Sequence, residues 1–223
     1  MPGSRRAPRH VPVQNGETGG PGGDGKGRRV THLTMDELQR GLDHVRDAPR
    51  DGGTLRLIVR RPAVDAREVL EEGALSLAEG LVGDTWHLRG SSRSVDGRAH
   101  PDMQLTIMGA RAAALVAQAP DRWPLAGDQL YVDLDLSAAN VPPGTRLSIG
   151  EAVVEVTGQP HTGCRKFVDR FGLDAMKLVN SPAGRSLNLR GVNARVVRAG
   201  AVRTGDTVRK LEPDARPGHA PGA

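Results

Sequence analysis

The single cysteine of the chain, Cys164, is the residue whose type and surroundings best suit chemistry. It follows the glycine-bounded loop 158–163 (GQPHTG) and precedes Arg165 and Lys166, at the predicted start of a helix. Helix-start amides and neighbouring cations favour the thiolate form of a cysteine, which is both a nucleophile and a soft metal ligand. The sequence therefore predicts that Cys164 is a reactive centre.

Several neighbours of Cys164 are candidates to assist it. His161 lies three residues earlier, where it can polarise the thiol or join it on a metal. We expect Thr162 and Gly163 to orient a bound group, and candidate cofactor-binding cations to include Arg165, Lys166 and Arg190. Plainer interpretations stay open, because a free cysteine is often a small buried hydrophobe. The cations after it can equally be a solvated helix face, and Arg190 an outward-facing residue near a strand.

Other kinds of site are disfavoured because the sequence lacks residues that they require near Cys164. The loop has the GxxxxG spacing of a phosphate loop, but Cys164-Arg165 stands where that motif needs Lys and Ser/Thr. A structural zinc site cannot be assembled around one cysteine. A Cys–His nucleophile pair would need a more distant histidine such as His87 or His100. Two aspartates that follow glycines, Asp84 and Asp128, are typical of turns.

The elements that must position this loop are mostly short strands. β-Branched alternation predicts strands on both sides of Gly150, over 147–149 and 152–157, and helical spacing resumes at 165–170. A capping box at Thr34 and Glu37 begins a helix that ends before Pro49. Further strands are predicted at 55–60, 103–108, 129–136, 186–189, 194–197 and 207–211, and further helices at 67–74, 110–119 and 174–179. This pattern predicts a mainly β fold, a twisted barrel of short strands with a few short helices.

Composition divides the chain into a folded part and two tails. Residues 1–31 are rich in Gly, Pro and Arg and carry six basic against two acidic residues, a net charge of +4 out of +5 for the whole chain. We expect this tail to be disordered, residues 32–211 to form one domain, and residues 212–223 to fray. The domain itself is nearly neutral and aromatics make up only 2% of the chain, so nucleic-acid binding is disfavoured.

Cellular location follows from what the sequence lacks. It contains no apolar run of the length that a membrane helix needs, and its start lacks the apolar region of a secretory signal. One cysteine cannot form an intrachain disulfide. A reducing cytoplasm is the simplest expectation.

Four segments resemble the MOSC domain family, named for the C-terminal domain of molybdenum-cofactor sulfurases. They are EGLVGD at 79–84, GDQLYVDLDL, PPGTRLSIGEAVVEVTGQPHTGCRKF and LRGVNARVVRAGAVRTGDTVRK, within about residues 54–211. The segment around Cys164 is the most specific of them. Thr162-Gly163 stands where the family usually has a proline before the cysteine.

The resemblance implies a barrel-like fold and a role for Cys164 as sulfur carrier or as ligand of molybdenum on a pterin cofactor. It implies a molybdenum-cofactor-dependent reductase or a sulfurtransferase-like component, with a sulfur donor (a cysteine desulfurase) or an electron-donor protein as partner. Pyridoxal phosphate binding follows only by family association, since no aminotransferase-like domain supplies the lysine. A thiol-based redox sensor or a metal-free small-molecule binding module is the alternative. The oligomeric state is left open.

Overall fold

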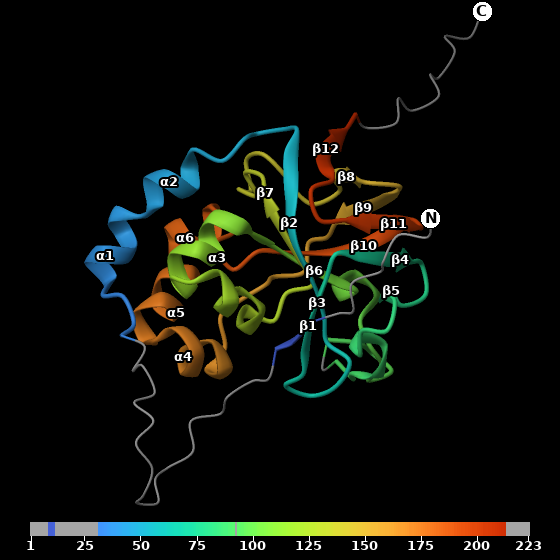
Figure 1. The fold of residues 1–223 in the computed structure, drawn as a ribbon, viewed down its shortest axis with the longest axis horizontal. Coiled ribbons are helices and arrows are strands. Elements are labelled where there is room, and N and C mark those ends of the chain that lie inside the picture. The colour runs from blue at the N-terminus through green and yellow to red at the C-terminus, as the bar shows by residue number, and fades with distance from the viewer. Residues whose placement is uncertain (1–8, 12–30, 92, 213–223) are drawn as a thin grey trace, which may run out of the picture.

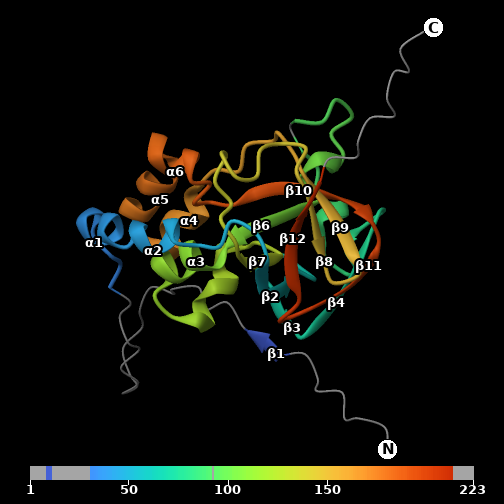
Figure 2. The same ribbon diagram turned by 90° about the horizontal axis from the view of Figure 1, so that it is seen from above.

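The computed structural model describes residues 9–11, 31–91 and 93–212, and its centre is a closed barrel of seven strands. The antiparallel pairing of β2 (Gly53–Arg60) with β7 (Leu130–Asp133) closes the ring (Figures 1 and 2). Strand β6 (Leu105–Gly109) runs parallel to its neighbour β7, and the other pairs of neighbouring barrel strands are antiparallel. The order around the ring is β2 (Gly53–Arg60), β12 (Thr207–Leu211), β8 (Arg146–Ile149), β9 (Ala152–Val156), β10 (Val192–Arg198), β6 (Leu105–Gly109) and β7 (Leu130–Asp133). The mainly β, barrel-like fold predicted from the sequence is confirmed.

Further strands extend the barrel. β3 (Arg67–Leu70) pairs with the end of β2, and β1 (Arg9–Val11) pairs with β3. A second sheet contains β11 (Gly200–Arg203), β4 (Glu72–Ser76) and β5 (Gly80–Leu81). Its buried Leu75, Leu81 and Val202 belong to the same hydrophobic cluster as the barrel interior, so this sheet packs directly against the barrel.

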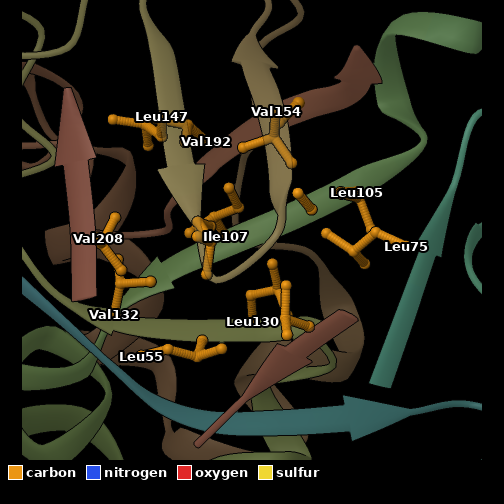
Figure 3. Close-up of a cluster of buried hydrophobic side chains, with 14 of the residues drawn as sticks. Leu55, Leu75, Leu105, Ile107, Leu130, Val132, Leu147, Val154, Val192 and Val208 are labelled. Atoms are coloured by element: carbon orange, nitrogen blue, oxygen red, sulfur yellow. The ribbon is translucent and has the colours of Figure 1, made fainter. Parts of the chain in front are cut away.

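The hydrophobic cluster inside the barrel consists of aliphatic side chains. Figure 3 shows Leu55, Ile107, Leu130, Leu147 and Val154 converging from different strands. All five are fully buried. The low aromatic content is therefore no obstacle, because Leu, Ile and Val from seven strands suffice to fill a narrow barrel.

A second core lies between the barrel and a layer of helices. Successive residues of a strand point to opposite faces. Ile107 and Leu130 therefore enter the barrel, whereas their neighbours Met108 and Tyr131 pack under the helices. The helices gather at one end of the molecule (Figures 1 and 2), and they are α1 (Met35–Arg40), α2 (Leu42–Arg46), α3 (Ala110–Ala117), α4 (Arg165–Phe171), α5 (Leu173–Asn180) and α6 (Pro182–Ser186). Short 3₁₀ turns are η1 (Trp86–Leu88), η2 (Pro101–Met103) and η3 (Pro120–Ala126). Within the described residues, no helix has the length and apolarity to cross a membrane.

Two predicted elements are wrong. The helix expected over 67–74 is instead β3 and β4, because residues 67–70 find an open edge of β2 to pair with. The strand expected over 186–189 is the end of α6 and a turn. Ser181 caps α6 by accepting a hydrogen bond from the Gly184 amide, and Pro182 occupies its first position, where no amide is needed.

The tail predictions fall mostly outside the described residues. Of the segment 1–31 the structure describes only 9–11 and residue 31, and of 212–223 only residue 212. Arg9–Val11 is the strand β1.

Candidate functional site

Cys164 lies on the surface at the junction between the loop after β9 and helix α4. Its side chain is exposed and its backbone is extended, which makes it the N-cap residue of α4. The Cys164 carbonyl accepts hydrogen bonds from the amides of Phe167 (3.0 Å) and Val168 (3.2 Å), so the backbone is anchored to the first turn. The thiol makes no capping hydrogen bond to the helix. The alternative of a buried structural cysteine is thereby excluded.

The residue before the cysteine is held on both sides by one side chain of α5. Asn180 Oδ1 accepts a hydrogen bond from the Gly163 amide at 2.9 Å, and Asn180 Nδ2 donates to the Gly163 carbonyl at 3.2 Å. A Cβ added at Gly163 would lie 3.0 Å from Val179 Cγ2 and 3.3 Å from Met176 Cγ. The glycine that replaces the family's usual proline therefore lets the loop approach α5 closely.

His161 faces inward, toward a buried ion pair. Its Nδ1 lies 3.6 Å from Asp128 Oδ1, and Arg190 NH1 donates to Asp128 Oδ2 at 2.6 Å. Arg190 also donates to the Ala126 carbonyl at 2.9 Å, and its guanidinium lies 5.3 Å from the ring centroid of Phe167 on α4. Arg190 is 8% exposed, so the interpretation of this residue as outward-facing is wrong.

Burial shifts the pKa values of His161 and Asp128. It lowers the pKa of His161 well below its usual range, with help from the cationic Arg190, Arg61 and Arg93. Burial also raises the pKa of the Asp128 carboxyl, although Arg190 and Arg61 act in the opposite direction. Four buried polar atoms of this part of the structure have no hydrogen-bond partner among the described residues: Asp128 Oδ1, His161 Nδ1, Arg190 Nε and Asn193 Oδ1. Such a cluster is uncommon in a purely structural core.

A second buried ion pair lies at the end of β2. Arg61 forms a two-pronged contact with Asp84, with Nε to Oδ2 and NH2 to Oδ1 both at 2.8 Å. Arg61 NH1 also donates to the Gly127 carbonyl at 2.9 Å, next to Asp128. Asp84 and Asp128, which the sequence suggested to be turn residues, are thus buried counter-ions of two arginines.

Arg67 adds a buried positive charge, and the carboxylate that interacts with it is Asp65. The Arg67 side chain donates to the carbonyls of Pro124 (3.2 Å) and Ala66 (2.6 Å). Burial, reinforced by Arg170, Arg61 and Arg89, lowers its pKa to about 10, which leaves it charged at neutral pH. Both Arg67 NH2 and Arg170 NH1 lie within 4.0 Å of the position of a Cβ on Gly127.

The loop between β2 and β3 is attached to helix α4 by one carboxylate. Asp65 Oδ1 accepts from Lys166 Nζ and from Arg170 NH2, each at 3.1 Å. Asp65 adopts a left-handed backbone conformation (φ 59°), which is uncommon for a residue other than glycine. Arg93 makes a comparable link on the other side, where NH1 donates to the Pro160 carbonyl at 3.1 Å. Loops from three parts of the chain therefore meet around the Cys164 loop.

The remaining candidates lie at the edge of this arrangement. Thr162 is exposed, and Arg165 is 91% exposed with its Nε 3.6 Å from Asp169 on the outer face of α4. His100 caps η2 by accepting from the Asp102 amide at 3.2 Å, and His87 lies in η1. The structure thus places His161 beside the Asp128–Arg190 pair and fixes Gly163 to Asn180. Cys164, Arg165 and Lys166 lie on the exposed start of α4.

Several site residues were not predicted: Arg61, Asp65, Arg67, Asp128, Arg170 and Asn180. Their partners are far away in the sequence, such as Arg190 for Asp128, 62 residues later. The one available signal was the Gly-Asp pair itself, which occurs at both 83–84 and 127–128.

The comparisons with known proteins agree with this architecture. Residues 109–209 match the model of the MOSC domain family. These residues form a MOSC domain. The match contains Cys164, His161, Asp128 and Arg190, and is shorter than the stretch 54–211 over which the sequence resembles the family.

Two solved structures share the fold at a TM-score of 0.50. The YUAD protein from Bacillus subtilis aligns with a TM-score of 0.50 and 17% identity over 72% of this chain and 97% of that chain. A hypothetical protein aligns with a TM-score of 0.50 and 21% identity over 73% of this chain and 69% of that chain. YiiM from Escherichia coli has a TM-score of 0.47 and 20% identity over 72% and 70% of the two chains. No curated protein sequence is significantly similar to the chain.

Proposed function

We propose that this MOSC protein holds a molybdenum cofactor with Cys164 as the ligand of the metal, and acts as a cofactor-dependent reductase or sulfurtransferase-like component. The observation that carries the proposal is the exposed Cys164 thiol at the start of α4. His161 of the same loop faces the Asp128–Arg190 pair, and α4 carries Lys166 and Arg170, both paired with Asp65. A thiolate is the soft ligand that molybdenum requires, and guanidinium groups suit the anionic groups of a phosphorylated pterin.

The described residues fit such a cofactor. Arg67 is a buried cation whose hydrogen bonds go to backbone carbonyls, and Arg190 Nε is a buried donor without an acceptor among the described residues. Together with Lys166 and Arg170 they would hold an anionic ligand, while Thr162 would contact it from the rim. When bound, the cofactor would supply two-electron transfer of oxygen or sulfur at the metal. Among the described residues, no group of three or more His, Cys, Asp or Glu forms a cage for a bare metal ion, so cation binding by side chains alone is not favoured.

The described residues do not fit pyridoxal phosphate. This cofactor needs a lysine amine that is free to form a Schiff base in an enclosed site. Lys166 is paired with Asp65 and is 61% exposed, and Lys177 is exposed on α5. Lys210 donates to Asn140 at 2.9 Å, at the other side of the barrel strands. We propose no step through pyridoxal phosphate.

Molybdenum content tests the proposal. The protein purified from a host that makes the cofactor is expected to contain stoichiometric molybdenum by elemental analysis. Cys164→Ser should remove the metal while changing the unfolding midpoint little, because the side chain is exposed. Arg203→Ala is the matched surface control, since it removes an arginine from β11, at the opposite end of the molecule from α4 (Figures 1 and 2). Retention of molybdenum by Cys164→Ser would overturn the assignment of the ligand.

A sulfur carrier or a thiol redox sensor is the second candidate, supported by the accessibility of the same thiol. A sulfur donor such as a cysteine desulfurase, or an electron-donor protein, can approach an exposed loop. Mass spectrometry separates these outcomes. Metal-free protein with one extra sulfur atom on Cys164 indicates a carrier, and metal-free protein with a readily oxidised thiol indicates a sensor.

A further inference from the structure

We propose that the outer edge of β3 is a docking site for an extended peptide, that its occupant is the chain's own segment Arg9–Val11, and that docking holds Arg67 in place. The inference rests on the proposed function only for the anion that Arg67 would bind. It starts from the pairing of β1 with β3, which joins the N-terminal segment to a strand beside the candidate site (Figures 1 and 2). The two strands are antiparallel, in the register Arg9↔Val69, His10↔Glu68 and Val11↔Arg67.

The neighbouring strand β2 shows which backbone groups of β3 point to its outer edge. The Val59 amide donates to the Gln129 carbonyl at 2.7 Å, away from β3, although Val59 lies opposite Val69 in the register. Residues of an antiparallel pair alternate between bonded and non-bonded positions. Glu68 therefore bonds to β2, whereas the amides and carbonyls of Val69 and Arg67 point toward β1.

Docking of β1 matters most for the backbone of Arg67. The register between β2 and β3 begins at Glu68, so β1 is the strand that pairs with Arg67. The side chain of Arg67 is buried and donates to the Pro124 carbonyl at 3.2 Å. A cation that must meet an anion at a fixed position needs a fixed backbone, and one side of that support comes from β1.

The length of the chain allows the tail to be the occupant. Residues 12–30 connect β1 to the rest of the described chain, and nineteen extended residues reach at most about 60 Å. This exceeds the radius of gyration of about 16 Å expected for a domain of about 180 residues. Three paired residues make few hydrogen bonds, so the same peptide would bind weakly when free. Tethering raises its effective concentration to the millimolar range, which favours a docked but exchangeable strand.

The first test is amide hydrogen exchange, measured by NMR on the full chain. In wild type the amides of Arg67 and Val69 should be protected. Val11→Pro removes a donor that faces β3, so these two amides should exchange at least about tenfold faster, while Glu68 stays protected by β2.

His10→Pro is the matched control for this variant. His10 lies opposite Glu68, so its amide points away from β3, and a proline there should leave the exchange rates close to wild type. Unprotected Arg67 and Val69 amides in wild type would overturn docking. So would exchange rates that are equal in Val11→Pro and wild type.

The second test identifies the occupant of the edge. The peptide RRAPRHVPV, which has the sequence of residues 5–13, should slow the exchange of Arg67 and Val69 in Val11→Pro when added at millimolar concentration. The same peptide with proline in place of valine at position 11 should not. Absence of any slowing by the first peptide would overturn the edge as a peptide site. Protection that rises with protein concentration in wild type would assign the edge to a second copy of the chain and overturn the tail as occupant.

The third test concerns Arg67, through pyrophosphate affinity in calorimetry. Val11→Pro keeps every charge of the tail, and it should bind pyrophosphate about two- to tenfold more weakly than wild type, with His10→Pro unchanged. Equal affinities of Val11→Pro and wild type would overturn the positioning of Arg67 by β1. If wild type does not bind pyrophosphate, the anion site of the proposed function and the role of Arg67 are both contradicted, while the exchange rates still decide whether the tail docks.

Discussion

Asn180 hydrogen-bonds to both sides of Gly163, accepting from its amide at 2.9 Å and donating to its carbonyl at 3.2 Å. The residue that precedes Cys164 is therefore fixed by a side chain of α5, 17 residues later. A loop that carries a metal ligand or a nucleophile needs such support, because a small displacement of the reacting atom costs much of its activity.

Asn180→Ala should weaken this support. Two hydrogen bonds of a partly buried amide are lost, at about 0.5–1.5 kcal/mol each in the free energy of unfolding. We also expect the variant to retain less molybdenum than wild type under a chelator challenge. Asn180→Asp is the matched variant, since it keeps the acceptor for the Gly163 amide and loses the donor. If Asn180→Asp loses as much stability and molybdenum as Asn180→Ala, the hydrogen bond to the Gly163 carbonyl is the more important of the two.

Gly163→Ala tests the close approach of the loop to α5. The new methyl group would meet Val179 and Met176 at 3.0 and 3.3 Å, so the loop or the helix must move. We expect a loss of about 1–3 kcal/mol in urea unfolding, as for an overpacked core. Gly158→Ala, in the same loop, meets only Pro143 at 4.0 Å and should change stability far less. Equal effects of the two substitutions would contradict the packing explanation.

Removing the buried carboxylate of Asp84 should be the most destabilising of these changes. Asp84→Asn leaves the Arg61 guanidinium, whose side chain is 9% exposed, without its counter-ion. Breaking a buried pair in this way costs about 3–5 kcal/mol. Glu72→Gln is the comparison, because it breaks the exposed pair with Arg203 and should cost under about 1 kcal/mol. Similar unfolding midpoints for the two variants would show that the buried pair is not a stabilising contact.

Local features of the fold were predictable from the sequence, and long-range contacts were not. The capping box at Thr34 is present as predicted, with the Glu37 carboxylate accepting from the Thr34 amide at 2.8 Å and the Thr34 hydroxyl accepting from the Glu37 amide. Both residues lie within one helical turn, so the sequence contains all the information. The Arg61–Asp84 and Asp128–Arg190 pairs depend on barrel closure, which no local pattern specifies.

The same distinction explains the errors over residues 67–74. Arg67-Glu68-Val69-Leu70 is compatible with a helix or a strand when read alone. The decision is made by β2, which is long enough to pair with β7 and β12 and still offer Ile58–Arg60 to β3. The exposed position of Cys164 at a helix start was predictable, because it follows a glycine loop and precedes a helical pattern. Lys166 and Arg190 were named from the sequence, whereas Arg61, Arg67 and Arg170 were not, since their contacts are made by segments far apart in the chain.

Asp65→Asn should strengthen anion binding near Cys164. The Asp65 carboxylate neutralises Lys166 and Arg170, and an anionic ligand must compete with it for the same cations. We expect pyrophosphate to bind the variant about two- to tenfold more tightly in calorimetry, with the difference shrinking at high salt. Asp169→Asn removes the same charge from the exposed face of α4, where Asp169 pairs with Arg165, and should change affinity less. Weaker binding to Asp65→Asn would mean that Asp65 organises the site and does not compete for it.

The burial of His161 should appear as a pH dependence of stability. Its pKa in the folded chain lies well below the ordinary value near 6.5, mainly because the ring is buried. Between these two pKa values the unfolded chain binds a proton that the folded chain does not. Stability is therefore lost as the pH falls below about 6.5, at a rate of at most about 1.4 kcal/mol per pH unit.

His161→Gln removes this contribution, so its free energy of unfolding should fall about 1 kcal/mol less than that of wild type between pH 7.5 and 5.5 in urea titrations. The Asp128 carboxyl acts in the opposite sense, since its raised pKa makes the folded chain bind the proton first as the pH falls. Both proteins contain Asp128, so the difference between them reports on His161. His44→Gln, which removes an exposed histidine of α2, is the control for the loss of a histidine side chain. If wild type and His161→Gln lose stability equally on acidification, His161 is not held neutral by the fold.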